Sequence, residues 1–338
     1  MFLIVTRNFP PDVGGMQTLM GGLSETLLDH GPVKVFTYDY PNSKIYDDKS
    51  SMSIERIKGI KLFKKYRKAN LVNNFIKENS NIRALFLDHW KSLELLNKEY
   101  LKKIKTICLI HSKEINHKKG SFANRRILKA FKNINQVVAN SEYTKNLAIE
   151  IGIDGNKIIV INPGVFPVKE IDKSSIKEAD NLLKKKSPRL ITVSRFDKRK
   201  NHEKVIMALR NLKQIYPNII YTCVGYGEEE ENIKKLTNEL ELSENVMFLK
   251  NISQNLKNAL VSKSNLFVMP SIIHKTSVEG FGIAYVEAAQ YGIPSIGGKD
   301  GGASDAIKNN ETGIICDGNS LEEIYSSIDL ILKNNSYL

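Results

Sequence analysis

The sequence of 338 residues contains no apolar run approaching the roughly twenty residues that a membrane-spanning helix needs. Its first residues, MFLIVTRNFPP, have no basic segment ahead of their short apolar run, so no secretory signal is expected. Cysteine is scarce too: Cys108, Cys223 and Cys316 are odd in number and widely spaced, which excludes a disulfide framework and zinc-site spacing. We therefore expect a soluble, cytoplasmic protein with buried, reduced thiols.

Acidic side chains are scarce in the first half of the chain only. Residues 1–168 carry 27 basic and 15 acidic side chains, a net +12, whereas residues 169–338 carry 23 and 22, a net +1. A strong basic excess is typical of proteins that meet anionic partners. No nucleic-acid recognition motif accompanies this charge, so nucleic acid is not an expected partner.

Much of the excess lies in residues 56–77, RIKGIKLFKKYRKANLVNNFIK. Ile60, Phe63, Leu71 and Phe75 can share one face of a helix there, among lysines and arginines. One interpretation is an amphipathic helix that lies on an anionic membrane surface, peripheral to its inner face. The other is a solvated basic helix whose apolar stripe packs on its own domain.

Short β-branched runs alternate with helix-length segments through both halves: FLIVT, VKVFTY, ALFLD, TICLI, QVVA and IIVI, then LITVS, IIYTCV, VMFL, LFVM, PSIG and GIIC. This rhythm predicts an α/β fold with parallel, doubly wound sheets. The polar, lysine-rich segment 165–188 separates the halves. We expect two Rossmann-like lobes, residues 1–166 and 167–338, with motifs at their strand ends facing a cleft between them.

In the first lobe, Gly14 and Gly15 precede a helix expected to start near Met16. Glycines at a helix N-terminus let backbone N–H groups approach a phosphate or a sugar, although a tight strand-to-helix turn explains them equally well. His111 directly follows the strand KTICLI, where it can offer a hydrogen bond to a substrate. A lone histidine is more often a satisfied structural residue.

In the second lobe, Arg195 follows a strand and Lys200 precedes a helix expected to start near Asn201. Two fixed cations at a cleft mouth can neutralise a diphosphate leaving group. The alternative is a solvated basic loop, because Lys198 and Arg199 lie there as well. The nearby G-x-G in CVGYGEEEE lacks the further features of a dinucleotide site.

The segment TSVEGFGIAYVEAAQYG places Glu279 before a helix expected to begin near Gly282, and Glu287 inside that helix. Free N–H groups of Phe281, Gly282 and Ile283 would favour an anion at the helix start. Carboxylates beside an anion site are explained if they accept hydrogen bonds from sugar hydroxyls. A nucleotide sugar would satisfy both kinds of group, whereas a merely exposed Glu287 would leave the glycines unexplained.

These motifs resemble the retaining glycosyltransferases of family 4, the glycosyl transferases group 1 proteins with the GT-B fold. EGFGIAYVEAAQYGIPSIGGKDGGASDAI is similar to the E-x7-E region of that family, and VSRFDKRKN, VGYGEEE and NPGV are similar to three further family segments. Ser194, Asn201, Lys250 and Asp305 depart from the usual family residues. Most relatives continue into a helix that crosses back onto the first lobe. Since this sequence ends before one, we expect looser closure or a longer chain.

The resemblance implies roles for the charged residues. Arg195 and Lys200 would bind the donor diphosphate, Glu279 would contact hydroxyls of the transferred sugar, and Glu287 would bind the ribose. No D-x-D triplet occurs in the sequence, so no catalytic metal or other cofactor is expected.

The resemblance also implies roles for backbone groups and for one histidine. The amides of Phe281 and Gly282 would hold phosphate or sugar, and the backbone near Lys250 and Asn251 would meet the base. His111 would lie near the donor sugar and the reacting centre.

The segment FPPDVGGMQ is similar to the first loop of phosphatidylinositol mannosyltransferases. Gly14 and Gly15 would then belong to a loop that closes over the donor phosphates and the acceptor. Together with the basic segment 56–77, this similarity favours a lipid-linked or cell-envelope glycan as acceptor.

The expected reaction is transfer of a hexosyl group from a nucleotide-diphosphate sugar to an acceptor hydroxyl with retention. Two rivals remain from the sequence. One is a GT-B nucleotide-sugar epimerase, which turns over its donor without an acceptor. The other is a nonenzymatic basic protein that binds membrane or nucleic acid, with strong salt dependence and no nucleotide affinity.

Overall fold

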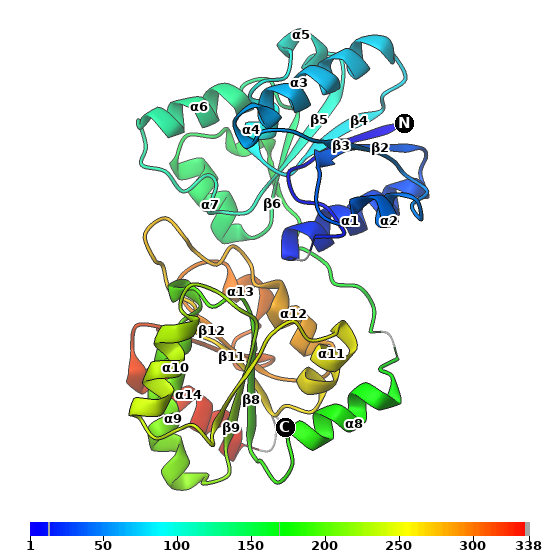
Figure 1. Cartoon of the computed structure of the whole chain (residues 1–338). Helices are drawn as coiled ribbons and strands as arrows, with labels where there is room; N and C mark the ends of the chain where they lie inside the picture. The colour runs from blue at the N-terminus through cyan, green and yellow to red at the C-terminus, as the bar shows by residue number, and fades with distance from the viewer. Residues whose placement is uncertain (13, 169, 335–338) are drawn as a thin grey trace. The chain divides into compact units, whose positions relative to one another are not determined.

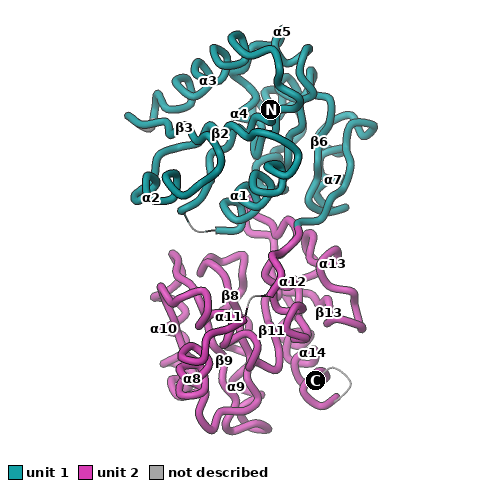
Figure 2. Tube along the Cα trace, turned by 90° about the vertical axis from the view of Figure 1, so that its right-hand side faces the viewer, with its two compact units in different colours: residues 1–163 teal, residues 164–338 magenta. Residues whose placement is uncertain are grey.

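The computed structural model describes residues 1–12, 14–168 and 170–334. The chain forms two compact units, Met1–Pro163 and Gly164–Leu338 (Figure 2). The boundary predicted from the sequence lies three residues later, after residue 166. Each unit is a parallel sheet with helices on both faces, as the alternation of strands and helices predicts (Figure 1).

Unit 1 contains a seven-stranded sheet in the order β3-β2-β1-β4-β5-β6-β7. Its strands are β1 Phe2–Val5, β2 Val33–Tyr38, β3 Ser53–Ile57, β4 Ala84–Leu87, β5 Lys105–Ile110, β6 Gln136–Ala139 and β7 Ile158–Val160. Its helices are α1 Gly15–Leu28, α2 Ser43–Asp47, α3 Lys61–Glu78, α4 Trp90–Leu93, α5 Lys98–Leu101, α6 Phe122–Phe131 and α7 Glu142–Glu150, with a 3-10 turn η1 at Gly155–Lys157.

Successive residues of the central strand β1 supply the two cores of unit 1. Leu3 belongs to the core under α3 to α7, and Ile4 to the core under α1 and α2. Side chains alternate between the faces of a strand, so an uninterrupted apolar run such as FLIV fills both cores.

Unit 2 contains a six-stranded sheet in the order β10-β9-β8-β11-β12-β13. Its strands are β8 Arg189–Val193, β9 Ile220–Val224, β10 Val246–Leu249, β11 Leu266–Met269, β12 Ser295–Gly298 and β13 Gly313–Cys316. Its helices are α8 Lys173–Leu182, α9 His202–Ile215, α10 Glu230–Glu239, α11 Gln254–Ser262, α12 Ile283–Ala289, α13 Ala303–Ala306 and α14 Leu321–Lys333, with a 3-10 turn η2 at Lys198–Lys200.

The helices of unit 2 also divide between the two faces of its sheet (Figure 1). Leu190 of β8 packs with α9, α10 and α14, while Ile191 packs with α8, α11 and α12. The three cysteines are buried and free, as the sequence predicts.

One strand and one helix boundary differ from the predictions. Arg56 and Ile57 belong to the edge strand β3, so the basic helix begins at Lys61 rather than at residue 56. Strand β3 was missed because its sequence, SIERI, is largely polar: an edge strand needs few apolar residues. No described helix is both long enough and apolar enough to cross a bilayer.

Each sheet has one position at which the strand order reverses. This switch point lies between β1 and β4 in unit 1 and between β8 and β11 in unit 2. In open α/β sheets ligands bind beyond the carboxyl ends of the strands at such a point. The loops that follow these four strands are therefore the first places to look for a site.

Candidate functional site

The loop after β8 brings two cations to the switch point of unit 2. The buried ring of Phe196 anchors the loop, and the side chain of Asp197 accepts a hydrogen bond from the backbone N–H of Lys200. The intervening 3-10 turn directs the side chains of Arg199 and Lys200 toward the loop after β11. Burial lowers the pKa of Lys200 from its ordinary value.

Glu279, in the loop after β11, receives both cations. Arg199 Nη1 lies 2.6 Å from Glu279 Oε2, and Lys200 Nζ donates to the same oxygen. Burial raises the pKa of this carboxyl, but the attraction of Lys200 and Arg199 outweighs it and holds the pKa at about 2. The structure thus gathers two cations and an ionised carboxylate at one switch point.

The structure brings together only part of the predicted set. Lys200 and Glu279 meet, as expected of neighbours in one site, whereas Arg195 is exposed, and no ion pair among the described residues includes it. Arg199 was not among the predicted site residues, and the alternative interpretation placed it in a solvated basic loop, yet it faces inward with 15% of its side chain exposed. The signal that could have revealed Arg199 is its place beside Lys200 in a turn capped by Asp197.

Glycines after β12 hold the backbone of Glu279 in place. The N–H of Gly302 donates to the carbonyl of Glu279 at 2.8 Å. A Cβ on Gly301, whose φ is 108°, would lie 2.4 Å from that carbonyl oxygen. Only glycine allows this close approach, so the glycine-rich stretch packs against the backbone of Glu279 and fixes its position.

The helix after Glu279 begins where the sequence predicts, with Gly282 at its N-cap (φ 94°) and Ile283 as its first residue. Phe281 is buried, and no described residue accepts a hydrogen bond from the backbone N–H groups of Phe281, Gly282 or Ile283. Glu287 lies on α12 and forms an ion pair with Lys257 of α11, with 3.2 Å between Oε2 and Nζ. Glu287 therefore pairs with a lysine of a neighbouring helix, whereas Glu279 pairs with the two cations of the loop after β8.

The loops after β9 and β10 contain the remaining residues predicted for unit 2. Lys250 is exposed, with its Nζ 3.5 Å from Glu230 and 5.8 Å from the ring centre of Tyr226. Asn251 is also exposed, with a φ of 55°. A Cβ on Gly225 would lie 1.9 Å from the carbonyl oxygen of Ser194, so the G-x-G glycines let the loops after β8 and β9 pack together.

In unit 1, His111 follows β5 as the sequence predicts. Its backbone N–H donates to Glu114 Oε1 at 2.6 Å, and its Nε2 is buried without a partner among the described residues. Burial lowers the pKa of His111 to about 4 and raises the pKa of Glu114 to about 7. At neutral pH the imidazole is neutral and has one nitrogen open to a further hydrogen bond.

The loop after β1 crosses the switch point of unit 1. The carboxylate of Asp88, just after β4, accepts hydrogen bonds from the Thr6 hydroxyl at 2.7 Å and from the Arg7 N–H at 3.0 Å. Gly14 is the N-cap of α1, and Gly15 is the first residue of that helix. The helix therefore begins one residue before the predicted Met16, with Gly14 directly ahead of it.

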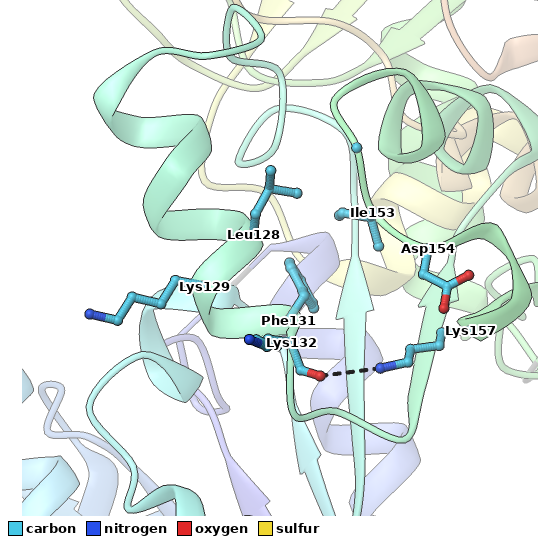
Figure 3. A pocket seen from close by; sticks show the side chains of 8 residues that line it. Leu128, Lys129, Phe131, Lys132, Ile153, Asp154 and Lys157 are labelled. Carbon is cyan, nitrogen blue, oxygen red and sulfur yellow. Dashed lines mark hydrogen bonds between the residues drawn. The ribbon is translucent and has the colours of Figure 1, made fainter.

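A separate hollow of about 460 Å³ lies elsewhere in unit 1. Leu128, Phe131 and Ile153 line it, together with three lysines and Asp154, and Lys157 Nζ donates to the Lys132 carbonyl (Figure 3). Its residues precede β6 and β7, so the hollow lies at the amino ends of these strands. It is therefore distinct from the switch-point residues.

Family models match both units. The model described as Glycosyltransferase Family 4 matches residues 13–168, and the model described as Glycosyl transferases group 1 matches residues 173–338. A GDP-mannose-dependent alpha-(1-6)-phosphatidylinositol monomannoside mannosyltransferase of Mycolicibacterium smegmatis is 23% identical to the chain. That alignment covers 98% of this chain and 89% of the relative.

Solved structures show the same two-domain architecture. HepE of Anabaena in complex with UDP matches with a TM-score of 0.81 and 18% identity, over 99% of this chain and 91% of that one. Sucrose-phosphate synthase of Thermosynechococcus elongatus matches with a TM-score of 0.78 and 20% identity, over 99% and 90%. At these identities the likeness establishes the fold.

Proposed function

Because the chain belongs to the glycosyltransferases of family 4, with the group 1 domain in its second unit and the GT-B fold, we propose that it transfers a hexosyl group with retention. The donor is a nucleotide-diphosphate sugar and the acceptor is a hydroxyl of a lipid-linked or cell-envelope glycan. Unit 2 binds the donor and unit 1 the acceptor. The observation that most supports this proposal is the contact of Glu279 with Arg199 and Lys200 at a switch point.

The charges of this cluster suit the departure of a diphosphate. A fixed cation held in a partly buried site stabilises the negative charge that develops on a leaving group. Lys200 is such a cation, and Arg195, exposed on the same loop, can meet a diphosphate from the solvent side. Glu279 Oε2 is occupied by the two cations, so its other oxygen is the one to accept from a sugar hydroxyl.

In the proposed reaction the acceptor oxygen attacks the anomeric carbon on the face from which the diphosphate departs. The new glycosidic C–O bond forms, the bond from the anomeric carbon to the phosphate oxygen breaks, and the acceptor proton passes to that oxygen. His111, neutral at pH 7, would offer a hydrogen bond near the reacting centre. Positive side chains and backbone amides would replace a metal in stabilising the leaving group.

The relatives point to different nucleotides. The mycobacterial relative is named for GDP-mannose, whereas the Anabaena structure contains UDP. The base would meet the backbone near Lys250 and Asn251, and Glu287 would bind the ribose once released from Lys257. A thermal-shift screen of UDP-, GDP- and ADP-sugars in the presence of a chelator identifies the donor and tests metal independence together.

Helix α3 supports a membrane-bound acceptor. The predicted apolar stripe divides: Leu71 and Phe75 pack against the core of unit 1, whereas Ile60 and Phe63 are 74% and 60% exposed. Leu62 and Tyr66 are exposed beside them, among lysines. Exposed apolar residues within a basic helix favour contact with an anionic membrane surface.

The product decides between the proposal and its enzymatic rival. With the donor from the screen and an acceptor lipid extract, we expect a glycoside whose anomeric configuration, read by NMR, matches that of the donor. Conversion of the sugar without any acceptor would indicate an epimerase. Absence of nucleotide-sugar affinity together with strongly salt-dependent lipid or nucleic-acid binding would indicate a nonenzymatic protein.

A further inference from the structure

One lysine of the basic helix α3 points inward. Lys68 is 3% exposed, whereas its neighbours Lys65 and Arg67 are exposed. Removing an ammonium from water is costly unless hydrogen bonds compensate, so a buried lysine in a helix otherwise rich in solvated cations needs a reason.

The Lys68 ammonium has specific partners at the switch point of unit 1. Its Nζ donates to the Thr6 carbonyl at 2.9 Å and to the Ser92 hydroxyl at 3.1 Å, and it lies 4.8 Å from the ring centre of Tyr38. Burial lowers its pKa to about 8, against the attraction of Asp88, so the charge is still present at pH 7. Helix α3 is thus tied to the end of β1.

The loop of residues 7–12 starts from this point and is held by other side chains as well. Asp88 accepts from the Thr6 hydroxyl and the Arg7 N–H. The Tyr40 hydroxyl donates to the Arg7 carbonyl at 2.7 Å, and Arg56 donates to the Pro10 carbonyl at 2.6 Å. Side chains from several elements therefore fix the first part of the loop.

We propose that Lys68 is a positioning residue, which holds the base of the loop of residues 7–12 in the geometry that the substrates meet. The Lys68 ammonium donates to the Thr6 carbonyl, and the Asp88 carboxylate accepts from the Thr6 hydroxyl, so the two side chains hold Thr6 through different atoms. The effect on the loop stands on these contacts alone. Its consequence for turnover rests on the proposed function, in which this loop closes over the donor phosphates and the acceptor.

Amide hydrogen exchange of the whole chain tests the effect on the loop. The Arg7 and Asn8 amides are bonded to the Asp88 carboxylate and the Thr6 hydroxyl, so their exchange reports the geometry at Thr6. In K68M we expect these amides to exchange about tenfold to a hundredfold faster, because a hydrogen bond from a charged donor is lost. Amides of β9, in unit 2, should be unchanged.

Matched variants separate positioning from general damage. K65M removes an exposed lysine from the same helix and should leave exchange at Arg7 and Asn8 unchanged. K68R keeps a charged donor and should restore part of the protection. If K68M does not fold, S92A removes a hydrogen-bond partner of Lys68 and should loosen the same two amides. Unchanged exchange in K68M, or in S92A as its substitute, would overturn the proposal.

Turnover is measured on the same proteins. If wild-type protein transfers sugar, K68M should lower kcat by about tenfold to a hundredfold while the donor KM changes little, since misplaced groups slow the reaction more than they weaken binding. Wild-type kcat in folded K68M with a loosened loop would remove the catalytic consequence. An inactive wild type would instead count against the proposed function and leave the exchange result standing.

Discussion

At the scale of single residues, Arg199 shows what a sequence motif leaves open. The segment VSRFDKRKN offers four cations, and the sequence prediction selected Arg195 with Lys200. The geometry of one turn decides which of them reach Glu279, and that geometry depends on the burial of Phe196 and the cap by Asp197. Neither is visible in a charge pattern.

Removing Arg199 should change how stability responds to acid. The pKa of Glu279 is about 2 in the folded protein and near 4.5 when unperturbed, so its pairing contributes stability above pH 4.5 that is lost as pH falls through 2. In R199M one of the two cations is gone, and the fall in unfolding free energy between pH 5 and 3 should shrink. Urea unfolding at each pH measures it. R210M changes an exposed arginine of α9 and should show the same pH dependence of unfolding free energy as wild type. If R199M shows that same pH dependence too, Arg199 does not lower the pKa of Glu279.

Glu114 should produce the opposite pH dependence. Its folded pKa of about 7 lies above its ordinary 4.5, so the contribution to stability is present below pH 4.5 and lost as pH rises through 7. E114Q should flatten the decline in unfolding free energy between pH 5 and 7.5, whereas E150Q, at an exposed glutamate of α7, should not. If the unfolding free energy of E114Q still declines over this pH range, groups other than Glu114 cause the decline.

At the scale of elements, close loop packing in unit 2 depends on Gly225. A Cβ there would meet the Ser194 carbonyl oxygen at 1.9 Å, so G225A should lower the unfolding free energy by more than about 2 kcal/mol. G292A is the control, because Gly292 has a φ of 73° but open space around it, and should cost only about 1 kcal/mol of backbone strain. Equal losses in denaturant unfolding would show that strain, not the clash, dominates.

The exposed part of α3 makes a prediction about membranes. L62A/F63A removes two exposed apolar side chains and should weaken binding to anionic phospholipid vesicles about tenfold or more in a flotation assay. I215A removes an exposed isoleucine of unit 2 and should bind as wild type does. Zwitterionic vesicles should bind weakly in every case. Undiminished binding by the double variant would indicate that α3 is a solvated helix, the other interpretation of its sequence.

At the scale of the whole molecule, the sequence predicts most of the architecture because buried parallel strands are nearly continuous apolar runs. FLIV and IYTCV are read as strands without difficulty, whereas the edge strand SIERI is not. The charge asymmetry also coincides with the units: unit 1 holds the basic excess and unit 2 is nearly neutral. The sequence does not distinguish Lys68 from its solvated neighbours, because buried and exposed lysines occur at similar spacing along this helix.

The proposed function requires unit 2 to hold a nucleotide-diphosphate sugar through the cations of the loop after β8 and through Glu279. Thermal shift of the whole chain with UDP-, GDP- and ADP-sugars and EDTA tests it most directly, because a ligand that binds only the folded state raises the melting temperature. We expect one nucleotide class to raise the melting temperature of wild type despite the chelator, and K200A to lose most of that rise. No rise in wild type with any donor, or an undiminished rise in K200A, would show that this site does not bind the donor in the proposed way.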